Sequence, residues 1–264
     1  MSEPAASRLP ADLAARLAEV ATLPRVVLAT DFDGTLAPFV ENPLDAAPVD
    51  GAMDVLRAAA ALDGVTVALV SGRDVDTLRT LSGASDDVIG LIGSHGAQSS
   101  RDDLGVGAML DDAARTRLAD LDEALTQLLT RHPQARIERK PAAVVLHTRG
   151  LPEDAARAAL ADAAPLGERQ GVHALAGKSV LELGVVDTSK GLALRALQAV
   201  VDADAVVYLG DDVTDEKAFA LLPADEGHVT IKVGAGETGA TYRVESIPDV
   251  VAVLDAFVGH RRSH

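Results

Sequence analysis

The sequence contains no cysteine and no tryptophan, and only four phenylalanines and two tyrosines supply aromatic rings. Without cysteine, the chain cannot form a disulfide, a zinc–thiolate centre or a thiol nucleophile. With so few aromatic side chains, the hydrophobic core must consist mainly of alanine, valine and leucine. The chain also lacks any uncharged apolar run of about 18 residues, which excludes a simple membrane-spanning helix. Its first residues lack the basic and apolar regions of a signal peptide, so a cytoplasmic location is expected.

Positive charge is scarce as well. Lysine and arginine total 24 against 40 aspartates and glutamates, which gives a formal net charge of −16. This balance argues against nucleic acid or an anionic membrane as the main partner. The 264 residues are 48% hydrophobic and 24% charged, an ordinary globular composition that suffices for one large domain or two small ones. We expect a monomer.

The pattern of apolar residues predicts an α/β protein. Short apolar runs alternate with helical patterns in residues 1–104 and again in residues 187–264, as in a doubly wound parallel sheet with crossover helices. Between them, residues 105–186 show the order helix, strand, strand twice, which predicts an α+β cap inserted into the core. The best-defined core elements are two strands, at 26–30 and 65–70, and a helix at 48–62.

Polar residues stand at the ends of the predicted core strands. In an open parallel sheet, ligands bind beyond the carboxyl ends of the strands, so these side chains should meet at one edge. Taken singly, such residues could form a solvated acidic turn or cap a helix. The set consists of one lysine before a core helix, one serine and five acids: Lys190, Ser71, Asp31, Asp33, Asp211, Asp212 and Asp215.

This set of groups fits phosphoryl-transfer chemistry. Asp31 and Asp33 can face the same side of an extended segment, and paired carboxylates repel each other unless a cation lies between them. Oxygen ligands without any cysteine point to Mg²⁺. A carboxylate beside such an ion can attack phosphorus, while its neighbour protonates the leaving alkoxide and later deprotonates water. Ser71 and Lys190 would bind phosphate oxygens.

Four short motifs resemble those of the haloacid dehalogenase superfamily of phosphatases. They occur in the expected order as Asp31–Leu36, Ser71–Arg73, Lys190 and Gly210–Glu216. A five-residue match such as the first arises by chance on the order of 10⁻⁴ times in a chain of this length, so four ordered matches are a specific signal. The resemblance implies that Asp31 is the nucleophile and that its neighbour Asp33 is the general acid and base. The implied Mg²⁺ ligands are the Asp31 side chain, the Asp33 carbonyl and Asp211, with Asp212 or Asp215 in support.

Finer motifs extend from about residue 25 to residue 257: Asp33–Pro38, Ser94–Ala97, Lys140-Pro141 with Leu146-His147, Gly177-Lys178 with Leu181-Glu182, Gly210–Glu216 and Ile231–Gly234. Together they resemble the motifs of trehalose-6-phosphate phosphatases. In that family, the cap supplies Lys, His and Glu side chains that hold the disaccharide over the phosphate site. After Glu182, residues 184–187 depart from the Lys-Pro-Arg-Gly-type stretch of many members, which affects sugar contacts and not the chemistry. The implied substrate-binding residues are Lys140, His147, Lys178 and Glu182 in the cap, and Arg73, His95 and Gly96 in the core.

The resemblance implies an enzyme that hydrolyses trehalose 6-phosphate to trehalose and phosphate through an aspartyl-phosphate. One alternative keeps the chemistry and changes the sugar to sucrose phosphate, glucosylglycerol phosphate or a hexose phosphate. Another is a sugar-phosphate sensor without catalysis, although such a protein has no use for Asp33. Taken singly, His95, His147 and Glu182 also fit structural roles.

One further motif is not expected to bind a dinucleotide. Residues 234–239 fit the pattern G-x-G-x-x-G and follow a predicted strand, as a dinucleotide-binding fingerprint would. That fingerprint needs a helix directly after it and a second strand inside the same unit. The residues that follow do not resemble a helix start, so a loop near the site is predicted instead.

Overall fold

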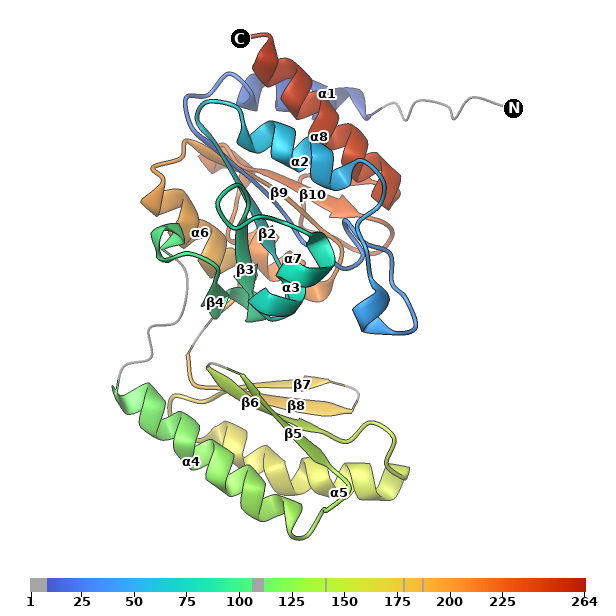
Figure 1. Ribbon diagram of the computed structural model, residues 1–264, viewed down its shortest axis with the longest axis vertical. Coiled ribbons are helices and arrows are strands. Elements are labelled where there is room, and N and C mark those ends of the chain that lie inside the picture. The colour runs from blue at the N-terminus through green and yellow to red at the C-terminus, as the bar shows by residue number, and fades with distance from the viewer. Residues whose placement is uncertain (1–8, 106–111, 141, 178, 187) are drawn as a thin grey trace, which may run out of the picture. The chain divides into compact units, whose positions relative to one another are not determined.

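The computed structural model describes residues 9–105, 112–140, 142–177, 179–186 and 188–264. The chain divides into two compact units (Figure 1). We call residues 1–107 with 189–264 the core unit and residues 108–188 the inserted unit.

The described residues of the core unit form a seven-stranded sheet in the order β11-β10-β9-β1-β2-β3-β4. Neighbouring strands pair in parallel, except that β4 is antiparallel to β3. The central strand β1 pairs with β2 on one side and with β9 on the other. The strands are β1 (Val26–Thr30), β2 (Val65–Val70), β3 (Gly90–Gly93), β4 (Gln98–Ser99), β9 (Ala205–Gly210), β10 (Val229–Val233) and β11 (Tyr242–Val244).

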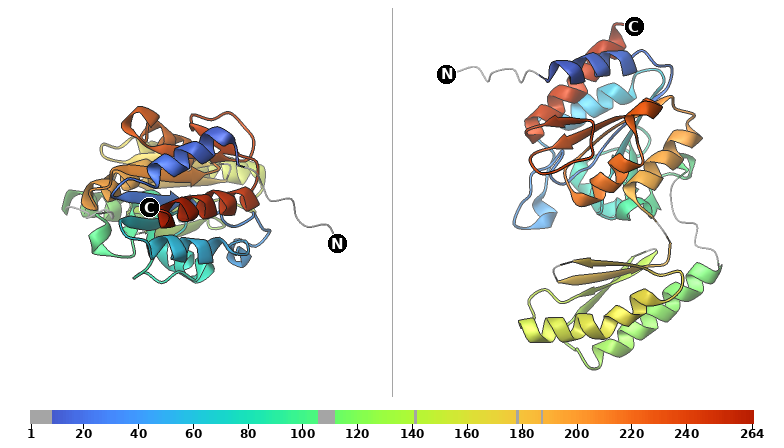
Figure 2. Two further views of the ribbon diagram at one scale, coloured as in Figure 1. Left: turned by 90° about the horizontal axis from the view of Figure 1, so that it is seen from above. Right: turned by 180° about the vertical axis from the view of Figure 1, so that it is seen from behind.

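Helices cover both faces of this sheet (Figure 2), which is why the central strands are continuous apolar runs without alternation. One face packs against α1 (Ala11–Val20), α2 (Ala52–Ala60), α3 (Val75–Ser82) and α8 (Ile247–Arg262). The other face packs against α6 (Lys190–Val200) and α7 (Val213–Ala220). Among the described residues, no helix combines the length and the apolar character needed to cross a bilayer.

The prediction of strands at 26–30 and 65–70 is confirmed, whereas the helix predicted from residue 48 begins later, at Ala52. Gly51 directly before it has a φ of +83°, in the left-handed region, so the chain enters the helix only after that turn. The helix α1 was not predicted, although its buried Leu13, Leu17 and Val20 have helical spacing.

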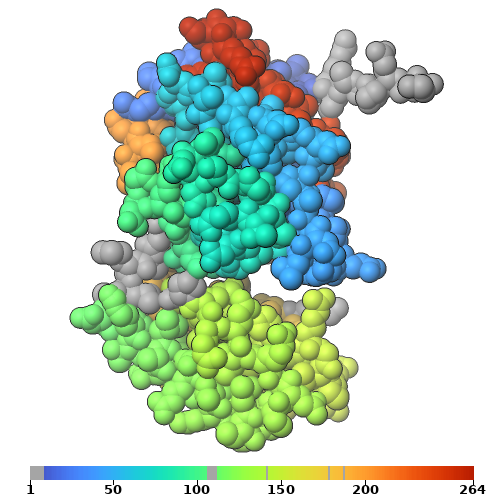
Figure 3. All heavy atoms as spheres, in the orientation of Figure 1, coloured from blue at the N-terminus to red at the C-terminus, as the bar shows by residue number. Residues whose placement is uncertain are grey.

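The inserted unit has one antiparallel sheet with two helices on one face. Its atoms form a continuous body in the space-filling view (Figure 3). Val144, Leu146, Leu181 and Leu183 face the helices and belong to a hydrophobic core of this unit's own. The sheet order is β5-β6-β8-β7, with β5 (Arg136–Lys140), β6 (Ala143–His147), β7 (His173–Gly177) and β8 (Val180–Gly184), and the helices are α4 (Asp112–Leu129) and α5 (Glu153–Ala163).

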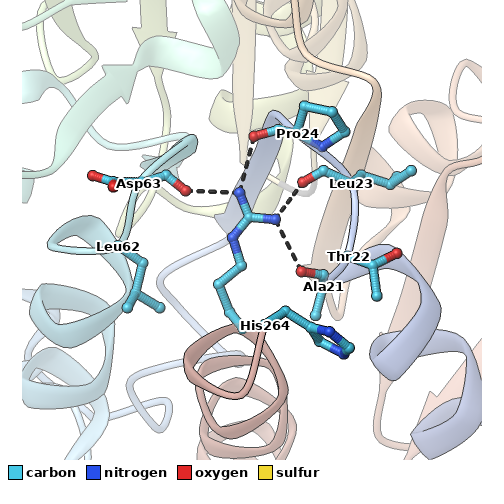
Figure 4. Close-up of a pocket in the computed structure, with 8 residues that line it drawn as sticks. Ala21, Thr22, Leu23, Pro24, Leu62, Asp63 and His264 are labelled. Atoms are coloured by element: carbon cyan, nitrogen blue, oxygen red, sulfur yellow. Dashed lines mark hydrogen bonds between the residues drawn. The ribbon is translucent and has the colours of Figure 1, made fainter.

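The basic end of the chain has a structural role. Arg261, in the last turn of α8, donates hydrogen bonds to the backbone carbonyls of Ala21, Leu23, Pro24 and Asp63 (Figure 4). These carbonyls lie after α1 and in the turn before β2, so one guanidinium ties three segments of the core together. These four hydrogen bonds use the donors of both terminal guanidinium nitrogens.

Candidate active site

The ends of β1 and β9 bring the predicted acidic residues together. Asp31 directly follows β1, Asp211 directly follows β9, and Thr30 pairs with Leu209 at the ends of these strands. One carboxylate oxygen from each of Asp31, Asp211 and Asp215 lies within 4.8 Å of the other two. The structure therefore assembles at one sheet edge side chains that are up to 184 positions apart in the sequence, from 31 to 215.

Asp31 and Lys190 form a buried ion pair at this edge. Lys190 Nζ lies 2.8 Å from Asp31 Oδ2, and the two residues are only 2% and 4% exposed. Asp31 Oδ1 accepts a hydrogen bond of 2.7 Å from the backbone N–H of Phe32, which fixes the carboxylate. Burial raises the pKa of Asp31 well above its usual value, and the Lys190 ammonium offsets part of that rise. Burial alone would lower the pKa of Lys190, but the Asp31 and Asp215 carboxylates raise it, so Lys190 stays charged.

Asp215 is fully buried and hydrogen-bonded on every side. Its Oδ1 accepts hydrogen bonds from Lys190 Nζ at 2.9 Å and from the Tyr208 hydroxyl at 2.6 Å. Its Oδ2 accepts the backbone N–H groups of Asp211 at 2.9 Å and of Asp212 at 3.1 Å. Four donors use the roughly four acceptor directions of a carboxylate. Asp215 therefore acts by orienting its neighbours.

Asp211 and Asp212 are adjacent in the sequence but differ in their surroundings. Asp212 caps α7, with Oδ1 accepting the Thr214 N–H at 2.8 Å, whereas Asp211 Oδ1 receives a long hydrogen bond of 3.3 Å from the Thr35 hydroxyl. Burial and then the negative charges of Asp215 and Asp212 raise the pKa of Asp211 to about 6. Burial acts in the same direction on Asp212, but the Lys190 charge and the Thr214 hydrogen bond lower its pKa to about 2.

The glycine of the Asp-Phe-Asp-Gly-Thr motif is required by this packing. Gly34 has a φ of +78°, and a Cβ placed on it would lie 2.1 Å from Asp211 Oδ2. Any other residue would displace the Asp211 carboxylate. The motif therefore supplies two acids, Asp31 and Asp33, and its glycine leaves the space that the Asp211 carboxylate occupies.

Asp33 is held by Arg73 in a two-pronged ion pair. Arg73 Nε and Nη2 each donate to one Asp33 oxygen at 2.6 Å, and the guanidinium lies over the Phe32 ring at 5.9 Å from its centroid. The Asp33 hydrogen bonds outweigh burial and raise the pKa of Arg73. Buried Ser71 accepts the Arg73 N–H on its hydroxyl at 3.2 Å. The Ser71–Arg73 motif is thus joined to the Asp31–Leu36 motif through its arginine.

The predicted residues His95 and Gly96 lie next to this motif in a strained loop. Ser94 and His95 have φ values of +48° and +54°, which non-glycine residues rarely adopt. Backbone hydrogen bonds hold the loop, with Ser94 N–H donating to Arg73 O at 2.7 Å and His95 N–H to Ser71 O at 3.0 Å. The His95 ring lies against Gly72, where an added Cβ would be 2.6 Å from Cε1.

The inserted unit places its predicted residues on the sheet face opposite its helices. Lys140 Nζ donates to Glu182 Oε2 at 2.7 Å, and His147 Nε2 lies 2.7 Å from Glu138 Oε2. The strand register puts Glu138 and Glu182 on either side of Val145, which places these pairs on one face. Sequence analysis did not select Glu138, although its alternation within β5 with Lys140 was a usable signal. Lys178 lies outside the described residues.

Several proteins of known name are similar to this chain. A family model described as trehalose-phosphatase matches residues 29–248. The trehalose-6-phosphate phosphatase of Escherichia coli is 31% identical over 229 residues, which cover 85% of this chain and 84% of that protein. A Mycobacterium tuberculosis protein described as an uncharacterized glycosyl hydrolase is 36% identical over 230 residues, or 81% of this chain, but the chain spans only 17% of its length.

Solved structures agree with the sequence comparison. The trehalose-6-phosphate phosphatase of Aspergillus fumigatus superposes with a TM-score of 0.69 at 26% identity, over 93% of this chain and 97% of that one. This likeness confirms the predicted haloacid-dehalogenase-like α/β fold with a parallel core sheet.

Proposed function

Because the chain belongs to the trehalose-phosphatase family, we propose that it hydrolyses trehalose 6-phosphate to trehalose and inorganic phosphate in the cytoplasm. The observation that carries this proposal is the buried contact between Asp31 and Lys190 at the edge where β1 and β9 end. A carboxylate beside an ammonium, with further acids around it, suits attack on a phosphate ester. A sensor without catalysis would not need this costly burial of charge.

We propose Mg²⁺ as the cofactor, because the donor set fits it. All donors are oxygens, and burial, followed by the negative charge of Asp215, raises the pKa of both Asp31 and Asp211; a divalent cation beside these carboxylates would favour their charged forms. The Asp31 and Asp211 carboxylates and the Asp33 carbonyl would hold the ion, with Asp212 in support. Asp215 would support it only through its hydrogen bonds, since its acceptor directions are used. When bound, Mg²⁺ would neutralise charge on the phosphate ester.

In the proposed first step, the Asp31 carboxylate attacks phosphorus and the bond from phosphorus to the sugar oxygen breaks. Lys190 neutralises negative charge on the phosphoryl oxygens, and the Ser71 hydroxyl and nearby N–H groups bind another of them. The protonated Asp33 side chain gives its proton to the departing sugar oxygen. The products are free trehalose and a phosphate ester of Asp31.

In the second step, Asp33 removes a proton from water, whose oxygen attacks phosphorus and releases inorganic phosphate and the Asp31 carboxylate. The two hydrogen bonds from Arg73 hold the Asp33 carboxylate in a fixed position, as this base role requires. The acid role of the first step instead needs a proton on Asp33, so Arg73 has to loosen its hold when substrate binds. Arg73 would then be free to bind a phosphate oxygen, the role expected for it from the sequence.

A panel of sugar phosphates tests this proposal directly. We expect phosphate release from trehalose 6-phosphate to exceed that from sucrose phosphate, glucosylglycerol phosphate and hexose phosphates, and to stop with EDTA. Faster release from another sugar phosphate would keep the chemistry and change the substrate. Tight binding of trehalose 6-phosphate without any phosphate release would favour the sensor.

We further propose that Lys140, His147, Lys178 and Glu182 of the inserted unit contact the sugar. Replacing Glu182 or Lys178 by alanine should then lower kcat/KM for trehalose 6-phosphate by roughly 10- to 1000-fold, since remote binding energy positions the ester over Asp31. Hydrolysis of p-nitrophenyl phosphate should be nearly unchanged, because this substrate has no sugar.

Glu123→Ala, on the exposed side of α4, is a matched control that should affect neither substrate. A parallel loss with both substrates would assign Glu182 and Lys178 to structure or to phosphate binding. No loss with either would favour hexose phosphates.

A further inference from the structure

Lys232 is a buried cation that the proposed reaction does not use. It lies in β10, beside Gly210 of β9, and is only 5% exposed. Its Nζ donates a hydrogen bond to the main-chain carbonyl of Asp211, the residue that follows Gly210. An ammonium is costly to bury unless it is paired, so this contact needs a compensating partner.

Glu216 supplies the opposite charge. Its Oε1 is buried, accepts no hydrogen bond from the described part of the chain, and lies 4.0 Å from Lys232 Nζ. Its Oε2 accepts the backbone N–H of Gly239 at 2.8 Å, which fixes the carboxylate so that Oε1 faces the lysine. Gly239 ends the G-x-G-x-x-G segment, whose carbonyls at Gly234 and Gly236 accept hydrogen bonds from Arg243. Arg243 therefore anchors the segment whose last residue binds Glu216.

We propose that Lys232 is a positioning residue for the active site. It fixes the peptide carbonyl of Asp211, and thereby the direction of the Asp211 carboxylate, while Glu216 and the 234–239 loop hold Lys232 in place. This inference rests on the proposed function in one respect, since it takes Asp211 as a ligand of Mg²⁺.

A role of Lys232 through its charge and a role in positioning Asp211 predict opposite changes in Mg²⁺ affinity when the lysine is removed. If Lys232 acted only through its charge, removing it would remove repulsion and tighten the binding of Mg²⁺. If it positions Asp211, removing it lets the ligand move and weakens the binding. The sign of the change in the Mg²⁺ dissociation constant therefore separates the two roles.

The experiment is isothermal titration of the full chain with Mg²⁺, combined with steady-state kinetics on trehalose 6-phosphate. For Lys232→Met we expect Mg²⁺ to bind about 10- to 100-fold more weakly, as for other residues that orient metal ligands. At saturating Mg²⁺, kcat should fall while KM for the substrate stays within about twofold. Lys217→Met, on the exposed side of α7, is the matched control and should change neither quantity.

Unchanged or tighter Mg²⁺ binding by Lys232→Met would overturn the proposal. Lys232→Gln is uncharged and one bond shorter than lysine, so its amide should fall short of the Asp211 carbonyl, and it serves by the same criterion if the methionine variant fails to fold. Lys232→Arg restores charge and donors and should recover part of the lost affinity. If the unaltered protein binds Mg²⁺ but does not hydrolyse trehalose 6-phosphate, the proposed function fails while the titrations still decide the role of Lys232.

Discussion

Replacement of Asp31 by asparagine is expected to abolish phosphate release, with kcat lower by at least about 10⁴-fold. The amide keeps the size of the carboxylate and can still accept the Phe32 N–H, but it cannot attack phosphorus. Lys190 retains Asp215 as a partner at 2.9 Å, so the fold should survive the change. Phosphate release and thermal unfolding, measured on the same preparation, check both statements.

Asp54→Asn, on the exposed side of α2, is the matched control for Asp31→Asn and should retain full activity.

Asp33→Asn should behave differently from Asp31→Asn. Hydrolysis of trehalose 6-phosphate should fall by roughly 10²- to 10⁴-fold, whereas transfer from p-nitrophenyl phosphate should persist, because p-nitrophenolate leaves without a proton. Equal losses on both substrates would count against the acid role of Asp33. Turnover by Asp31→Asn near that of the unaltered protein would assign the nucleophile elsewhere.

Removal of divalent cations should stop turnover completely, and added Mg²⁺ should restore it. Without the ion, burial raises the pKa values of Asp31 and Asp211, and the negative charge of Asp215 adds to the rise at both, so the site holds carboxylates that a bound cation would favour. Because Mg²⁺ binds the folded chain and not the unfolded one, it should raise the melting temperature and add about 2.7 kcal/mol to the free energy of unfolding when its concentration is a hundredfold above its Kd. Asp211→Asn should lose most of this gain. Full activity after exhaustive chelation would contradict the proposed mechanism.

The central strands and the edge of the site were predictable because local patterns determine them. Strands buried on both faces need continuous apolar runs, and the polar residues that end them must meet at one edge. Asp31, Ser71 and Asp211 could therefore be predicted as site residues from the sequence alone. The position of Lys190 also followed, since it comes directly before a helix pattern in the second half of the core.

Contacts between distant segments could not be read from local patterns. The hydrogen bond from Tyr208 to Asp215, and the hold of Lys232 on Asp211, depend on which strands are neighbours and on the direction of each side chain. In the sequence, a tyrosine within an apolar strand cannot be distinguished from an ordinary core residue, because the hydrogen-bond partner of its hydroxyl is not visible there. The start of α2 was misjudged for a related reason, since the left-handed conformation of Gly51 is one of several that glycine can adopt.

The position of β1 between β2 and β9 has a consequence for synthesis of the protein. Val26 pairs with Val65 from the same half of the core and with Ala205 from beyond the inserted unit. Such a long-range pairing forms slowly, and a nascent chain cannot complete it until the residues of β9 have left the ribosome. The inserted unit has its own apolar core and can fold earlier. Until β9 is available, the edge of β1 that pairs with it stays unpaired. Chains that end before residue 205 should therefore aggregate and be removed by proteases, and no partly active truncated form should accumulate.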